Sequence, residues 1–270
     1  MDIATLVGIV LGFASLIVAF LMEGGHAESL LGITAAMIVF GGTIGATMTS
    51  YSLADILSIP KLIARSMKTP PDRRPELVEE IVKLAEMARR DGLLALEGHP
   101  IDDPFLKRAV MMVVDGTDPE LTEQILHADV EAMAARHARA YGMFTTMGGF
   151  APTMGIIGTV MGLVHVLSSL ENPDELGPAI AVAFLATLYG VASANLLWLP
   201  IGNKLKLRSK EEVEERQLII EGILGIQAGE NPRMLREKLV VLLPPAARSG
   251  RATRGATAQV GTSAMAPGGE

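Results

Sequence analysis

Two threonines stand out among the residues that could take part in chemistry, because each places a hydroxyl group in a long apolar segment. Thr159 lies within residues 142–170 and Thr187 within residues 176–202, and neither segment contains Asp, Glu, Lys or Arg. If both segments are helices, both hydroxyls lie roughly 16 Å from the ends that flank the turn 171–175. Oxygen atoms at that depth could serve a carboxylate of a partner chain. The alternative is a hydrogen bond from each threonine to the backbone of its own helix.

The residues around the two threonines are small. They are Gly155, Gly158 and Gly162 in the first segment, and Ala183, Gly190 and Ala194 in the second. Small residues let membrane helices approach closely. Ala183, Thr187, Gly190 and Ala194 fall on one helical stripe. Such a stripe could pack a foreign helix or line a narrow path for an ion.

Two prolines could allow movement of these segments. Pro152 and Pro200 lie near the ends of the segments that face away from the turn 171–175. A proline inside a helix removes a hydrogen bond and favours a kink or hinge. Membrane helices also tolerate proline for structural reasons alone.

Other chemistries lack their residues. No phosphate-binding loop is present, which argues against ATP as an energy source. There are no cysteines and no histidine cluster, so we expect no metal site and no cofactor. The net charge of −7 argues against nucleic acid as a partner. Ion transport usually needs an ionisable side chain within the membrane. The long apolar segments of this chain contain no Asp, Glu, Lys or Arg, and their one histidine, His165, lies near the end of its segment. A titrating carboxylate would therefore have to come from another chain; otherwise the protein is a scaffold.

Four charge-free apolar segments must position these residues: 3–22, 30–51, 142–170 and 176–202. Each is long enough to cross a hydrocarbon core of roughly 30 Å as a helix. All 23 Lys and Arg residues lie in 52–142 or after Gly202, whereas the turns 23–29 and 171–175 are acidic. The positive-inside rule therefore places both termini and the long loop in the cytoplasm.

The predicted fold is an all-α membrane protein with four transmembrane helices and a helical cytoplasmic domain between helices 2 and 3. The expected regions are a transmembrane hairpin (1–51), the cytoplasmic helical domain (52–141), a second transmembrane hairpin that carries the ion path (142–202), a cytoplasmic helical tail (203–243) and a disordered tail (244–270). Within them we expect an amphipathic continuation of the second span from Leu53. We also expect helices from about Pro75, over 104–114, and from about Glu120 to Tyr141.

Five motifs, in order along the chain, resemble those of the flagellar stator branch of the MotA/TolQ/ExbB family. Residues 152–164 resemble its P-x-x-G-[IL]-[IL]-G-T-[VL]-x-G-L segment, and residues 185–200 resemble its T-L-Y-G…A-N…P segment. Residues 103–106 and 115–119 match as well. Arg89, Gly92, Leu96 and Glu97 match its R-x-x-G-x-x-x-L-E element. The resemblance covers roughly residues 1–243.

The resemblance implies a role for each candidate residue. Thr159 and Thr187 would line the ion path beside an aspartate of the partner MotB, and Pro152 and Pro200 would couple ion passage to movement. Arg89 and Glu97, helped by Arg90, would engage the rotor protein FliG, although charge alone would make them only a solvated face. Five copies of the chain would surround two copies of MotB in the bacterial inner membrane.

Two other functions stay open at this point. One is an ExbB/TolQ-type energiser of an outer-membrane system, although those proteins usually lack the N-terminal hairpin and the Arg89…Glu97 element. The other is a small-solute carrier, which usually shows internal repeats. The coupling ion, H⁺ or Na⁺, is not decided by the sequence.

Overall fold

The computed structural model describes residues 2–168, 173–245, 247 and 248, and all regular structure in them is helical. Four helical stretches are long and apolar enough to cross a membrane: Ile3–Met22, Ala27–Ser50, Pro119–Ser168 and Leu176–Gln227. The predicted all-α fold with four spans is confirmed. Of the acidic turn expected at 171–175, residues 173–175 form the start of a helix, and the other two lie outside the described residues. Of the disordered tail expected at 244–270, residues 246 and 249–270 lie outside them.

The chain divides into two compact units, each built from two separate stretches. We call Met1–Pro70 with Ala135–Ser209 the apolar unit, and Pro71–Ala134 with Lys210–Glu270 the charged unit. Two long helices, α8 (Pro119–Ser168) and α10 (Leu199–Gln227), contribute to both units. The boundaries expected from the sequence at 51, 141 and 202 remain predictions.

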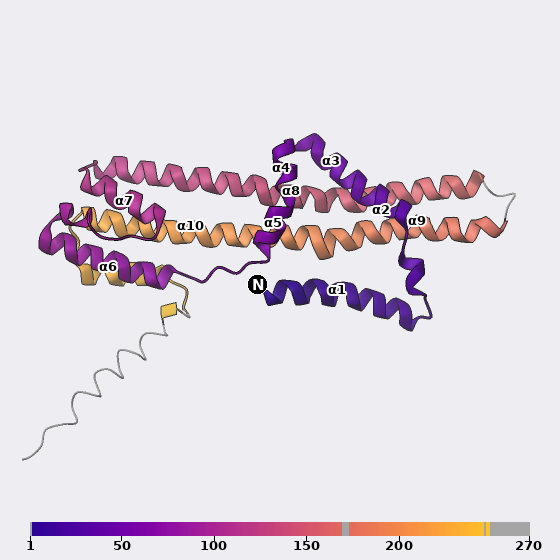
Figure 1. Ribbon diagram of the computed structural model, residues 1–270, viewed down its shortest axis with the longest axis horizontal. Helices are drawn as coiled ribbons and strands as arrows, with labels where there is room; N and C mark the ends of the chain where they lie inside the picture. The colour runs from indigo at the N-terminus through magenta and orange to yellow at the C-terminus, as the bar shows by residue number, and fades with distance from the viewer. Residues whose placement is uncertain (1, 169–172, 246, 249–270) are drawn as a thin grey trace, which may run out of the picture. The chain divides into compact units, whose positions relative to one another are not determined.

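The apolar unit contains the four spans. The first is α1 (Ile3–Met22), and the second comprises α2 (Ile33–Ala36), the π-helical η2 (Met37–Gly41) and α3 (Gly42–Ser50), after the short 3-10 helix η1 (Ala27–Leu30). Two short helices follow, α4 (Leu53–Leu57) and α5 (Ile59–Ser66). The other spans are the later part of α8 and the run of α9 (Pro173–Ser193), the π-helical η4 (Ala194–Trp198) and α10 (Figure 1).

The charged unit is held together by one apolar cluster. It is formed by α6 (Arg74–Asp91), η3 (Leu93–Leu96), α7 (Pro104–Val114), the first part of α8, the later part of α10 and α11 (Pro232–Val241). Leu77, Ile81 and Leu84 recur at helical spacing on α6 and are buried in this cluster. The N-terminus of α7 is capped by Asp103, whose carboxylate accepts bonds from the backbone N–H groups of Phe105 and Leu106 at 3.0 and 2.9 Å.

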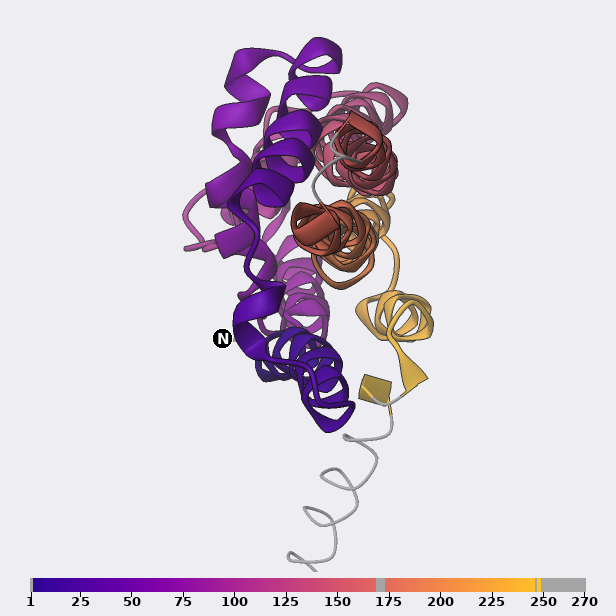
Figure 2. The ribbon, with the colours of Figure 1, turned by 90° about the vertical axis from the view of Figure 1, so that its right-hand side faces the viewer.

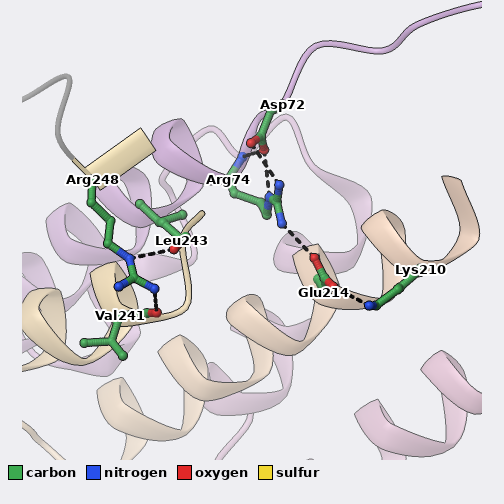
Figure 3. Close-up of polar contacts among 7 residues, drawn as sticks. All are labelled: Asp72, Arg74, Lys210, Glu214, Val241, Leu243 and Arg248. Carbon is green, nitrogen blue, oxygen red and sulfur yellow. Dashed lines mark hydrogen bonds and ion pairs between the residues drawn. The ribbon is translucent and has the colours of Figure 1, made fainter. Parts of the chain in front are cut away.

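A chain of charges joins the start of α6 to α10 within the charged unit (Figure 3). Arg74 donates to Asp72 at 2.8 Å and to Glu214 at 2.9 Å, and Lys210 lies 3.9 Å from the other oxygen of Glu214. The hydrogen bond from Arg74 lowers the pKa of Asp72 below its ordinary value. These contacts fix the N-terminus of the helix that carries Arg89 and Arg90.

Two local expectations need correction. The helix expected to end at Tyr141 continues without a break into the third span, so α8 has 50 residues. The second span does not continue into an amphipathic helix, because α3 ends at Ser50 and Tyr51 is extended. A separate helix, α4, then starts, and Ser52 caps its N-terminus. Helix α6 ends at Asp91, as the glycine at position 92 suggests: Gly92 has a φ of +86°, which ends a right-handed helix.

Candidate functional site: a paired hydroxyl at a glycine-lined helix seam

Glycines bring the backbones of α8 and α9 into direct contact. A Cβ atom on Gly190 would lie 2.5 Å from the carbonyl oxygen of Ala151, and one on Gly155 would lie 2.8 Å from that of Ala186. Further along, a Cβ on Gly162 would lie 2.5 Å from the Cβ of Ala183. No larger residue fits at these points without separating the helices. Figures 1 and 2 both show α9 running beside the later part of α8.

This close seam brings the two predicted threonines together. The Oγ1 atoms of Thr159 and Thr187 lie 2.5 Å apart, although the residues are 28 positions apart in the chain. Both side chains are half-buried. Thr159 Oγ1 also lies 2.9 Å from the carbonyl of Ala183 and 3.2 Å from that of Gly155 in its own helix. Thr187 Oγ1 lies 3.3 Å from the carbonyl of Gly155.

The pair has two complete hydrogen-bonding arrangements, because each hydroxyl has one proton to donate. If Thr187 donates to Thr159, then Thr159 donates to the carbonyl of Ala183 at 2.9 Å. If Thr159 donates to Thr187, then Thr187 donates across the seam to the carbonyl of Gly155 at 3.3 Å. In either case lone pairs remain on the hydroxyl oxygens. The site can therefore accept a hydrogen bond from water or from a protonated carboxyl group.

A tyrosine not assigned a role from the sequence links this hairpin to the first one. Tyr189 donates its hydroxyl proton to the carbonyl of Leu30 at 2.5 Å and accepts from the backbone N–H of Gly32 at 3.1 Å. It lies two residues after Thr187, inside the T-L-Y-G segment. An amphipathic tyrosine in an otherwise apolar span is the one signal that could have indicated this role.

The two prolines have different surroundings. Helix α8 continues through Pro152. Pro200 lies two residues after the end of the π-helical turn η4. The N–H of Leu199, which caps that turn, bonds to the carbonyl of Ala194, one residue further back than in an α-helix. The missing N–H of proline and the π-helical turn both leave the helix locally less regular at Pro200. The roles of both prolines in coupling remain predictions.

The charged candidates lie on two elements of the charged unit. Arg89 and Arg90 are in the last turn of α6, whereas Glu97 follows η3, on the far side of Gly92. Helical spacing therefore does not relate Arg89 to Glu97. Arg90 is bonded to its neighbour Asp91 at 2.8 Å, which raises the pKa of Arg90. Arg89 and Glu97 are exposed and have no ion-pair partner among the described residues. The ion pair between Arg90 and Asp91 was not predicted from the sequence.

No group of three potential metal ligands exists within the described ranges. The sequence has no Asp, Glu, Lys or Arg in residues 3–22, 30–51, 142–168 or 176–202. An ion that crosses near the threonine pair would thus meet only hydroxyl and carbonyl oxygens from this chain.

Comparison with known proteins gives the family. The model described as MotA/TolQ/ExbB proton channel family matches residues 97–218, and the model described as motility protein A N-terminal matches residues 6–92. Motility protein A of Bacillus subtilis is 39% identical over 250 residues, which are 90% of this chain and 92% of that protein. The chain belongs to the MotA/TolQ/ExbB proton channel family.

Another relative of this chain and two solved structures also come from the flagellar stator branch of the family. Chemotaxis protein PomA of Vibrio alginolyticus is 37% identical over 87% of this chain and 92% of its own length. The structure of Campylobacter jejuni MotAB superimposes with a TM-score of 0.85 at 34% identity, covering 91% of this chain and 97% of that one. The MotAB stator complex of B. subtilis gives 0.83 at 39% identity, covering 90% and 97%. A member of a proton channel family is not an enzyme. The ExbB/TolQ alternative is supported only by the broader family model.

Proposed function

We infer that the chain is a stator subunit of the bacterial flagellar motor, a multi-pass protein of the inner membrane that couples ion flow to torque. The observation that carries this function is the Thr159–Thr187 pair, 2.5 Å apart at the α8–α9 seam. It offers oxygen atoms in membrane spans that contain no Asp, Glu, Lys or Arg, in a chain whose relatives are motility proteins.

The missing carboxylate is supplied by MotB. A carboxylate buried in a membrane is stable only when it is neutral or has polar partners. The paired hydroxyls, with their free lone pairs, provide such partners for its protonated form. Two copies of MotB lie inside a ring of five copies of this chain.

Both termini and the charged unit face the cytoplasm. The supporting observation is that all 23 basic residues lie outside the charge-free segments 3–22, 30–51, 142–170 and 176–202, in 52–142 or after Gly202. The charged unit then meets FliG through Arg89 and Glu97. Neither side chain has an ion-pair partner within the described part of the chain, so a charged surface can pair with them without first breaking an ion pair there.

Arg90 has a smaller share in this contact. Asp91 holds its guanidinium at 2.8 Å, so part of its charge is already compensated. Pro152 and Pro200 act where movement of the helices is converted into movement of the charged unit. The coupling ion is H⁺ or Na⁺, and swimming speed as a function of sodium concentration distinguishes the two.

Complementation tests the function. Cells that lack their own stator genes should swim when given this chain together with its MotB, and should not swim with either one alone. The variant Thr159→Ala/Thr187→Ala should abolish swimming. The control is Thr153→Ala, on the same helix, whose hydroxyl bonds to the carbonyl of Phe150 at 2.7 Å. Normal swimming by the double variant would show that the two threonines serve packing alone.

A further inference from the structure

The helices α4 and α5 form a short segment with two different faces. One face packs on an apolar cluster of the apolar unit, formed by Met143, Phe144, Met147, Ala151, Ala194, Trp198 and Ile201. The residues that pack there are Ile56, Ile59, Leu62 and Ile63. The carboxylate of Asp55 points to the same side and accepts from Arg139 of α8 at 2.7 Å. The segment is therefore firmly attached by this face.

The opposite face combines exposed leucines with basic residues. Leu53 and Leu57 are 62% and 72% exposed. Lys61, Arg65 and Lys68 follow them and are exposed as well. Leu53 and Leu57 lie on one side of α4, since they are four residues apart, and Lys61 is on α5, which begins two residues after α4 ends. The only acidic residue in 52–68 is Asp55, which is turned toward Arg139.

The exposed face of α4 and α5 lies close to the end of the second membrane span. The second span ends with α3 at Ser50, and Leu53 comes only three residues later. In Figure 1, α4 and α5 run across the direction of α9 and of the later part of α8 instead of along it. A helix that crosses the direction of the spans at the end of one of them lies in the plane of the membrane surface.

We propose that the exposed face of α4 and α5 binds the headgroups of anionic phospholipids in the leaflet on the cytoplasmic side. Leu53 and Leu57 enter the acyl boundary, while Lys61 and Lys68 contact lipid phosphates. A basic amphipathic helix with few acidic residues is the composition that such surfaces bind. The surface sets the height of the α4–α5 segment, and through Asp55–Arg139 it holds α8 at a fixed level in the bilayer.

The test uses the complex with MotB in lipid nanodiscs that contain equal amounts of phosphatidylglycerol and phosphatidylcholine. The chain has no cysteine, so Leu57→Cys gives a single site for a fluorescent label. Bromine on the acyl chains of one lipid or the other quenches the label according to which lipid is nearby. We expect stronger quenching from brominated phosphatidylglycerol.

Neutral variants identify the lysines responsible. In Lys61→Gln/Lys68→Gln the preference for the anionic lipid should fall, by roughly fivefold per lysine, which corresponds to about 1 kcal/mol each. The matched control is Lys83→Gln/Lys107→Gln, which removes two exposed lysines of the charged unit and should leave the preference unchanged.

Two results would overturn the proposal. Equal quenching by both lipids would show contact with the bilayer but no recognition of anionic headgroups. No quenching by either lipid would show that protein, such as a neighbouring copy of this chain, covers the face. Neither readout depends on rotation or ion flow, so a failure here is distinct from a failure of the stator function.

Discussion

Replacing Gly190 by alanine should separate α8 from α9 and disrupt the threonine pair. The added Cβ would lie 2.5 Å from the carbonyl oxygen of Ala151 and 3.2 Å from the Cα of Gly155, both backbone atoms that no rotamer change can move. Relief of the first contact requires a shift of roughly 0.9 Å, since ordinary contacts begin near 3.4 Å. A shift of that size takes the 2.5 Å hydroxyl pair beyond the usual limit of about 3.0 Å.

The expected cost follows from two contributions. Overpacking of a tight interior costs about 1–3 kcal/mol. The weakened hydrogen bond adds about 1 kcal/mol. The assay is denaturant or thermal unfolding of the purified complex with MotB, followed by a swimming test. We expect a loss of about 2–4 kcal/mol in stability and a strong loss of motility.

Gly149→Ala is the control. Gly149 is also in a membrane-spanning helix, and a Cβ there would meet no atom of this chain within 4 Å. Both substitutions gain helix propensity equally, so the difference between them isolates the seam contact. Equal stability of the two variants would refute the close packing of α8 on α9.

Three further predictions concern other parts of the chain. Arg89→Glu and Glu97→Lys should each impair swimming while leaving assembly with MotB intact, with partial rescue by opposite charges in FliG; normal swimming of both would leave these residues as a solvated face. The N-terminus is held by an ion pair of Asp2 with Lys204, whose hydrogen bond lowers the pKa of Asp2 from 3.8 to about 2. Because the pKa of Asp2 is lowered in the folded protein, this ion pair is complete above pH 3.8 and is lost as the pH falls toward 2. A fluorescent label near the N-terminus should report the loss. An unchanged pH profile in Asp2→Asn would show that the ion pair does not hold the N-terminus. A cysteine at His26 should react with an impermeant thiol reagent in cells with a leaky outer membrane, whereas one at Thr69 should not, and the reverse pattern would invert the topology.

The sequence predicted the membrane architecture because it depends on local composition. Long runs without charge, such as residues 3–22, have no soluble alternative, and the helices follow from the need to satisfy backbone hydrogen bonds in lipid. The shared depth of Thr159 and Thr187 followed from counting residues on two helices that meet at one turn. Their direct hydrogen bond did not, because it depends on glycine contacts between backbones.

Contacts between residues far apart in the chain could not be predicted from the sequence. The bonds of Tyr189 to Leu30 and of Arg139 to Asp55 join residues 159 and 84 positions apart. The π-helical turn before Pro200 depends on how the backbone redistributes hydrogen bonds around a proline, and more than one arrangement is open to it. The end of α6 was easier to anticipate, since glycine is the residue that adopts a positive φ at little cost.

Ion flux through reconstituted complexes tests most directly whether this chain supplies the oxygen atoms and its partner the carboxylate. Proteoliposomes with the chain and MotB should conduct H⁺ or Na⁺ down an imposed gradient, and vesicles with this chain alone should not. Thr159→Ala/Thr187→Ala should reduce the flux strongly, while Thr153→Ala should match the wild type. Flux from this chain alone, or wild-type flux from the double variant, would contradict the proposed ion path.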